Sequence, residues 1–83
     1  MNKKGFKKAV NKCAICKNDI YDILDVHRIT EGGKYISYNC VVLCANCHRL
    51  HHSGKLTIVD KKYSTAGWVI FYEIDGEEKI ATV

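Results

Sequence analysis

The side chains best suited to chemistry in this chain lie in the stretch CANCHRLHH, which runs from Cys44 to His52. It places two cysteines and three histidines close together. Thiolates and neutral imidazoles are the side chains that bind zinc and related ions most readily. Their spacing should indicate which of them hold a structural metal, which hold a catalytic ion and which hold neither.

The cysteines form two pairs with the spacing of zinc knuckles. Cys13 and Cys16 are separated by two residues, as are Cys44 and Cys47. Each pair suits a tetrahedral ion, and the two pairs together fill its four positions. A closed site of this kind has no room for substrate, so we predict a structural Zn²⁺ whose binding energy is largely folding energy. The fifth cysteine, Cys40, lies in an apolar run and is expected to be a buried hydrophobic residue.

The histidines are spaced as ligands of a second ion. His48 and His52 are four residues apart and share one face of a helix, whereas His51 is expected to point toward the cysteines or the core and to hold neither ion. His27 is the remaining histidine, with Asp25 on the same face of a strand. Three neutral nitrogens leave positions open for water and a phosphate oxygen, which is a catalytic arrangement. The alternative is that the helical histidines only stabilise the helix C-terminus as cations.

The elements that position these side chains follow from periodicity and from turn residues. Residues 21–29 alternate and are predicted to form a strand, and 30–39 contain a Gly–Gly pair and are predicted to form a loop. Residues 40–43 form a short buried strand. The stretch 45–52 is predicted to be a helix that ends at Ser53–Gly54.

The remaining residues are predicted to be rich in β-structure. Residues 55–59 favour a third strand, and 67–74 and 77–83 flank Asp75–Gly76, a strong β-hairpin signal. One face of the strand over 67–74 is expected to pack on the core, and the alternative is a DNA-facing aromatic platform. That face consists of Trp68, Ile70, Tyr72 and Ile74.

Length and charge set the overall organisation. A chain of 83 residues is expected to be one α+β domain that needs a stabilising metal. We predict a basic arm over 1–12, a zinc-knuckle core over 13–54 and a β-rich extension over 55–83. The net charge is +4, and a basic arm favours DNA as a partner, with a solvated, partly disordered tail as the alternative. The expected DNA-binding residues are Lys3, Lys4, Lys7, Lys8 and Lys12.

No secretory segment and no apolar run long enough to span a bilayer is evident in the sequence. We therefore expect a cytoplasmic protein, in a bacterial cell or a phage-infected host, without a membrane partner. In that compartment clustered cysteines are typical of metal sites rather than disulfides.

The order of these motifs, CAIC … LDVHRI … GGKYISYNCVVLCANCHRLHH, resembles the HNH endonuclease family in its short phage and bacterial type. The resemblance extends from Cys13 to His52 and implies a ββα-metal (His-Me finger) core with zinc knuckles. The β-rich extension is similar to that of some short members.

The resemblance implies roles for individual residues. The letters HNH correspond to His27, Asn39 and His48, and His48 and His52 match the paired helix ligands of the nuclease-colicin branch. His27, His48 and His52 would hold a catalytic divalent ion (Mg²⁺, Mn²⁺, Ni²⁺ or Zn²⁺), with Asp25 beside them. Asn39 would tether the loop before the second strand through hydrogen bonds to the backbone.

One residue departs from the family pattern. Arg28 occupies the position of the general base in many members, and an arginine stays protonated. Our working hypothesis is that Arg28 contacts phosphate while metal-bound water or a nearby side chain supplies the base. Alternatively, His27 is the base and Asp25 completes the metal site, or the site binds DNA and cuts poorly. Strand alternation directs Arg28 away from His27 unless the strand kinks. The nearby candidate bases are Glu31, Tyr35 and Tyr38.

The function implied is divalent-metal-dependent hydrolysis of DNA phosphodiester bonds by an HNH endonuclease, with nicking of low sequence specificity. The alternative is a non-catalytic zinc-knuckle module that binds nucleic acid through a degenerate HNH site. A purely structural zinc protein leaves the histidines unexplained. Monomer and homodimer are both compatible with the sequence, as are roles in restriction, homing, phage packaging and repair.

Overall fold

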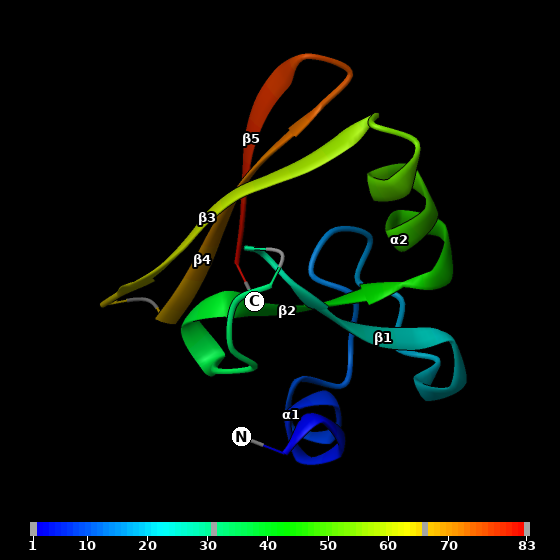
Figure 1. Cartoon of the computed structure of the whole chain (residues 1–83), viewed down its shortest axis with the longest axis vertical. Coiled ribbons are helices and arrows are strands. Elements are labelled where there is room, and N and C mark those ends of the chain that lie inside the picture. The colour runs from blue at the N-terminus through cyan, green and yellow to red at the C-terminus, as the bar shows by residue number, and fades with distance from the viewer. Residues whose placement is uncertain (1, 31, 66, 83) are drawn as a thin grey trace.

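The computed structural model describes residues 2–30, 32–65 and 67–82, which form two α-helices and two antiparallel sheets and confirm the α+β class (Figure 1). One sheet is formed by β1 and β2, and the other has the strand order β3–β4–β5. Two short 3₁₀ turns precede the strands of the first sheet. The elements are α1 (Lys3–Val10), η1 (Tyr21–Ile23), β1 (Leu24–Arg28), η2 (Ser37–Asn39), β2 (Cys40–Cys44), α2 (Ala45–His52), β3 (Leu56–Ser64), β4 (Gly67–Ile74) and β5 (Glu77–Thr82).

Strands β1 and β2 form an antiparallel pair that leads directly into α2. The pairing runs from Leu24 opposite Cys44 to Arg28 opposite Cys40. All of β2 is buried, as expected for its unbroken apolar run. The strand predicted over 21–29 begins later than expected, because its first residues form the turn η1.

Helix α2 begins and ends where the sequence predicts. Cys44 is its N-cap residue and Ser53 its C-cap residue. Gly54 follows with a φ of +85°, a conformation that glycine adopts without steric cost. The N–H of Lys55 then donates to the carbonyl of Leu50 at 3.1 Å, which satisfies a carbonyl of the last turn.

The predicted hairpin at Asp75–Gly76 is confirmed. These residues have φ values of 51° and 80°, as expected for a two-residue turn with positive φ at both positions. Strand β3 is longer than the prediction of 55–59. A bulge between Ile58 and Asp60 interrupts the alternation, so the sequence pattern ends while the strand continues to Ser64.

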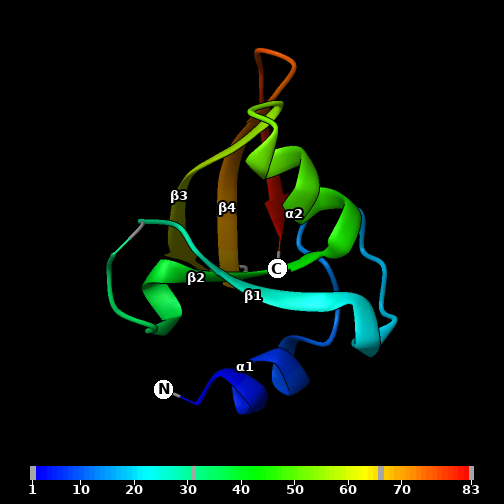
Figure 2. The same ribbon diagram turned by 45° about the vertical axis from the view of Figure 1, so that its right-hand side comes forward.

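One face of the β3–β4–β5 sheet covers the core, as predicted for Ile70, Tyr72 and Ile74 of β4, whereas Trp68 of the same face lies outside the buried cluster. Ile70 is fully buried, and Tyr72 and Ile74 pack against the buried cluster. Figure 2 shows this sheet and α1 on opposite sides of the β1–β2 pair. The largest fully buried aliphatic side chains come from both sheets: Leu24, Val41, Val42, Leu43, Leu56 and Ile70.

The N-terminal arm forms a helix over Lys3–Val10 that packs on the domain. The Oδ1 atom of Asn2 accepts a hydrogen bond from the N–H of Gly5 at 3.2 Å and caps the helix. Phe6 and Val10 are four residues apart and pack against the core. The apolar face holds the helix in place and leaves its lysines on the outside.

Lys61 connects the two sheets from within the core. Its side chain is only 7% exposed, and its Nζ donates to the carbonyls of Ser37 at 2.7 Å and Cys40 at 2.8 Å. The same Nζ lies 4.7 Å from the ring of Trp68 and 5.1 Å from that of Phe6. Burial lowers the pKa of Lys61. These partners are what a buried ammonium requires, so Lys61 has a structural role.

Candidate metal centre and histidine cavity

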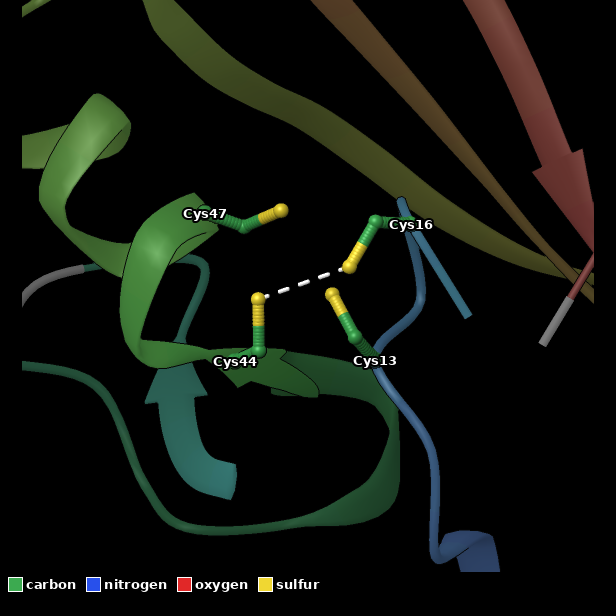
Figure 3. Close-up of side chains that lie close together, drawn as sticks. All are labelled: Cys13, Cys16, Cys44 and Cys47. Carbon is green, nitrogen blue, oxygen red and sulfur yellow. Dashed lines mark hydrogen bonds between the residues drawn. The ribbon is translucent and has the colours of Figure 1, made fainter. Parts of the chain in front are cut away.

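The four knuckle cysteines form one cluster, as their spacing predicts (Figure 3). Their Sγ atoms all lie within 4.8 Å of one another, and those of Cys16 and Cys44 are 3.4 Å apart. Metal–sulfur bonds of about 2.3 Å in a tetrahedron place the sulfurs about 3.8 Å apart. The cluster could therefore hold a structural metal such as zinc. Its members are Cys13, Cys16, Cys44 and Cys47.

The first knuckle is a tight turn attached to both sheets. The N–H of Lys17 donates to the carbonyl of Cys13 at 3.1 Å, and Lys17 has a φ of 65°. The N–H of Ala14 donates to the carbonyl of Val42 at 2.9 Å, which joins the turn to β2. The Nζ of Lys17 also donates to the carbonyl of Thr82, which joins the turn to β5.

The second knuckle lies at the N-terminus of α2, where the helix dipole favours negative charge. Burial alone raises the pKa of Cys13, but hydrogen bonds from the backbone N–H groups of Cys44, Cys16 and Ile15 bring it down to about 7. Burial and the neighbouring Cys13 raise the pKa of Cys47. Four thiols this close do not all ionise easily, and a bound cation removes the repulsion between them.

Cys40 lies outside this cluster. It is fully buried in β2, and burial raises the pKa of its thiol. Its environment is that of a small hydrophobic core residue, as expected.

Beyond the second knuckle, the histidines gather around an open cavity between β1 and α2. The cavity has a volume of about 460 Å³. It combines imidazoles, a guanidinium and a phenol with aliphatic walls. Its lining residues are Val26, His27, Arg28, Ile29, Tyr35, His48, His51 and His52.

His48 and His52 form the close pair that their spacing predicts. Their Nε2 atoms are 3.1 Å apart. Two nitrogens bound to one ion at about 2.0–2.1 Å lie about 3 Å apart, so the pair fits a shared metal. Asp25 Oδ2 lies 3.6 Å from His48 Nδ1, on the other side of the His48 ring. This is an ion-pair distance and is longer than a hydrogen bond; a carboxylate at hydrogen-bond distance from this nitrogen would orient a metal-binding imidazole.

His27 stands apart from that pair. Its ring centroid is 5.4 Å from that of His48 and only 4.1 Å from that of His51. Within the described residues, the ligand atoms of His27, His48 and His52 do not all come within 4.8 Å of one another, as those of the cysteines do. The Nε2 atom of His27 is buried and has no hydrogen-bond partner in the described part of the chain.

The surroundings of His27 keep its ring neutral. Burial lowers the pKa of His27 to about 4, with further lowering by the charges of His51, His48, His52 and Arg28. A neutral imidazole can accept a proton or bind a metal.

Arg28 lies beside His27 in the cavity, although strand alternation predicts that it points away. It is the last residue of β1, and its flexible side chain reaches toward the loop. Its Nη1 donates to the carbonyl of Gly33 at 3.0 Å, and its Cζ is 4.7 Å from the centroid of the Tyr35 ring. Arg28 and His27 therefore face the same space without a kink in the strand.

Asn39 holds the loop between the two strands in place. Its Oδ1 accepts a hydrogen bond from the N–H of Thr30 at 2.9 Å, and its Nδ2 donates to the carbonyl of Lys34 at 3.0 Å. A Cβ atom at Gly33 would lie 2.6 Å from this Nδ2 atom. Asn39 thus has the tethering contacts that the family resemblance implies, and it requires a glycine at position 33.

His51 and Tyr38 also lie in other positions than the sequence predicts. His51 was expected to point toward the cysteines or the core, but it lines the cavity against His27. Its position three residues after His48 is a helical signal that could have indicated this. Tyr38 contacts Trp68 rather than the cavity, which leaves Tyr35 as the nearby phenol. Glu31 lies outside the described residues.

The lysines of the N-terminal arm divide into two groups. Lys3, Lys4 and Lys7 line a groove of about 320 Å³ between α1 and β1, together with Asp25 and other residues. Lys8 and Lys12 do not line this groove. The Nζ of Lys3 lies 4.5 Å from the centroid of the Tyr35 ring, the same ring that Arg28 contacts. The basic face of α1 borders the histidine cavity, because Val26 lines both the groove and the cavity.

Neither helix in the described part of the chain is long and apolar enough to cross a membrane. Comparisons with family models, with curated proteins and with solved structures gave no match. The chemistry of the site and its geometry are therefore the basis on which a function can be assigned.

Proposed function

We propose that this protein is an HNH endonuclease that nicks DNA by divalent-metal-dependent hydrolysis of phosphodiester bonds. One observation carries the proposal: the His48–His52 pair, His27 and Arg28 face one open cavity that borders a lysine-lined groove. Paired imidazoles suit a metal ion, and lysines with an arginine suit the phosphates of its substrate. A module that only binds nucleic acid has no need of the histidines.

In this proposal the cysteine cluster holds one structural zinc ion. The tetrahedral sulfur set leaves no position for substrate. The zinc connects the first knuckle to the start of α2 and so fixes the helix that carries His48, His51 and His52.

The residues that would hold the catalytic ion are His48 and His52, with Asp25 as an orienting carboxylate. The 3.1 Å separation of the two Nε2 atoms supports this assignment. The ion, when bound, supplies Lewis-acid stabilisation of the phosphate and of the leaving oxygen. By closing the present 3.6 Å separation from Nδ1 to hydrogen-bond distance, the side chain of Asp25 would keep the His48 ring turned so that Nε2 faces the cavity.

The separate position of His27 supports the assignment in which it is the general base. Its Nε2 is buried and has no hydrogen-bond partner within the described structure, so as a base it would have to meet a water molecule that enters the cavity it shares with Arg28. The guanidinium of Arg28 would bind a phosphate oxygen and neutralise charge that develops there. Asn39 positions the loop that contacts Arg28 through Gly33.

The first experiment is cleavage of supercoiled plasmid by the zinc-loaded protein with added Mg²⁺, Mn²⁺ or Ni²⁺. We expect nicking that EDTA stops and that His52→Ala lowers by at least about 100-fold. Arg49→Ala, on an exposed part of the same helix, is the matched control and should nick normally. Absence of nicking by folded, zinc-loaded wild-type protein would refute the proposal and favour the non-catalytic binding module.

A second experiment separates the two roles open to His27. If His27 is the base, His27→Ala should lose at least about 100-fold in nicking rate while Mn²⁺ binds with unchanged affinity by calorimetry. Added imidazole should restore part of the activity. If His27 is instead a ligand, the Mn²⁺ affinity of the variant will fall together with the rate.

A further inference from the structure

Away from the histidine cavity, an aromatic cluster protrudes where the turn between β3 and β4 meets η2. Tyr38 comes from η2, Tyr63 from β3 and Trp68 from β4. The ring centroid of Trp68 is 4.7 Å from that of Tyr38 and 5.1 Å from that of Tyr63. Both contacts are edge-on, with interplanar angles of 84° and 76°.

The two phenol rings are left largely in water. Tyr38 is 65% exposed and Tyr63 is 67% exposed. Edge-on packing against Trp68 leaves most of the surface of both phenol side chains accessible. A core role does not require such exposure, and exposed aromatic rings are what a flat partner group needs for stacking.

The charges around this cluster favour an anionic partner. Exposed Lys34 belongs to the loop that leads to Tyr38, whereas the nearby Lys61 is buried and donates to backbone carbonyls, so it is not available to a partner. Among the described acidic residues of β4, β5 and their turn, the carboxylates gather at the opposite end of the sheet, about 20 Å away at the usual rise of a strand. These are Glu73, Asp75, Glu77 and Glu78.

The cluster is also connected to the proposed nuclease site. The loop over 30–39 contributes Tyr35 to the histidine cavity and Tyr38 to the aromatic cluster. Asn39 tethers this loop next to Tyr38. Because three residues of chain span at most about 11 Å, Tyr38 lies within reach of a few nucleotides from Tyr35, which lines the cavity.

We propose that Tyr38, Tyr63 and Trp68 form a stacking platform for unpaired bases of single-stranded nucleic acid. This inference rests on the proposed function, because it assigns the cluster to the same substrate. Stacking on aromatic rings tolerates every base and adds affinity for each base that stacks. The protein would then prefer substrates with a single-stranded segment beside the cleaved phosphate.

The test uses the full zinc-loaded chain and two oligonucleotides of equal length and charge, dT8 and an abasic analogue. Trp68 is the single tryptophan of the chain, so its fluorescence reports directly on the cluster. We expect dT8 to quench this fluorescence and to bind at least about five times more tightly than the abasic analogue. Equal affinity, or binding without a change in fluorescence, would overturn the proposal and favour a protein partner for the cluster.

Variants localise the effect. Tyr38→Leu combined with Tyr63→Leu removes the phenol rings but keeps apolar side chains, and should reduce the preference for dT8 to nearly one. Phe71→Leu is the matched control, because Phe71 lies in β4 on the opposite face of the sheet from Trp68. An unchanged preference in the double variant would overturn the proposal. Plasmid nicking without a preference for dT8 would refute the platform alone, whereas a dT8 preference without nicking would refute the nuclease alone.

Discussion

The cysteine cluster and the histidine cavity share helix α2 but differ in how they are closed. At the N-terminus of the helix, Cys44 and Cys47 complete a set of four sulfurs with no remaining position. At its other end, His48 and His52 pair beside an open cavity of about 460 Å³ that also contains Arg28. The closed site joins distant parts of the chain, whereas the open site has room for a substrate. Damage to the first should therefore abolish the fold, and damage to the second should abolish only activity.

The largest effect is expected at the closed site. Cys47→Ser should leave the chain unfolded at 25 °C, because structural zinc contributes about 10 kcal/mol or more and small domains are stable by about 5–15 kcal/mol in total. Circular dichroism and zinc content measured on the same sample test this. Cys40 is also buried, but it lies in β2 outside the cluster. The control variant Cys40→Ala should therefore keep both the zinc and the fold. A folded Cys47→Ser variant with full zinc would contradict the structural role.

At the open site, Asp25→Asn should lower the affinity for Mn²⁺ by about 10- to 100-fold, because the ring of His48 loses its orienting carboxylate. The zinc content and the fold should not change. Calorimetric titration with Mn²⁺ gives the affinity. Asp22→Asn, an exposed acidic residue in η1, is the control. Equal affinities of both variants would remove Asp25 from the site.

The loop beside the cavity gives a smaller effect on stability. Gly33→Ala places a Cβ atom 2.6 Å from Asn39 Nδ2 and 3.0 Å from the carbonyl oxygen of Thr30. We expect a loss of about 2 kcal/mol in the free energy of unfolding, measured with urea. Gly5→Ala is the contrast: its Cβ meets Asn2 at an ordinary 3.8 Å, and helix α1 should gain about 0.5–1 kcal/mol. Similar stability in both variants would mean that the tether of Asn39 adapts.

The pH dependence of His27 distinguishes its buried ring from a solvated one. Burial lowers its pKa to about 4, so the ring binds its proton less readily in the folded chain than in the unfolded chain, where the value is about 6.5. Its contribution to stability is complete above pH 6.5 and is lost as the pH falls toward 4. NMR of the zinc-loaded protein without added divalent ions should show His27 as neutral from pH 7.5 to 5.5. A midpoint of the His27 titration between pH 6 and 7 would contradict the lowering of its pKa by burial.

The smallest expected effect concerns the basic face. Replacing Lys3, Lys4 and Lys7 by glutamine should weaken DNA binding and reduce the slope of log K against log salt by about 1 for each lost phosphate contact. Fluorescence anisotropy at several salt concentrations measures this. The pair Lys8→Gln and Lys12→Gln, outside the groove, should change the slope less. The reverse result would place the DNA on the other side of α1.

Local spacing determined a large part of this structure. The two Cys-x-x-Cys knuckles, the limits of α2, the buried strand β2 and the Asp75–Gly76 hairpin follow from the sequence, because each depends on residues only a few positions apart. The same is true of the His48–His52 pair, since one helical turn brings residues four apart together.

Tertiary structure decided the features that depend on distant contacts. Packing of Phe6 and Val10 on the core turned the arm into a docked helix, and a bulge extended β3 beyond its pattern. No spacing rule predicts that the side chain of Arg28 bends toward Gly33.

The aromatic cluster and the inner face of the cavity also formed only on folding. His51 turned toward His27 because β1 packs beside α2, although the two histidines are far apart in the chain. Tyr38, Tyr63 and Trp68 come from three elements that meet only when the second sheet packs against the first. The sequence by itself determined which side chains can do chemistry, and the packing of the two sheets and α2 decided which of them face one another. The physical reason is that periodicity orients a side chain within its own element, whereas burial of apolar surface sets the relative positions of the elements.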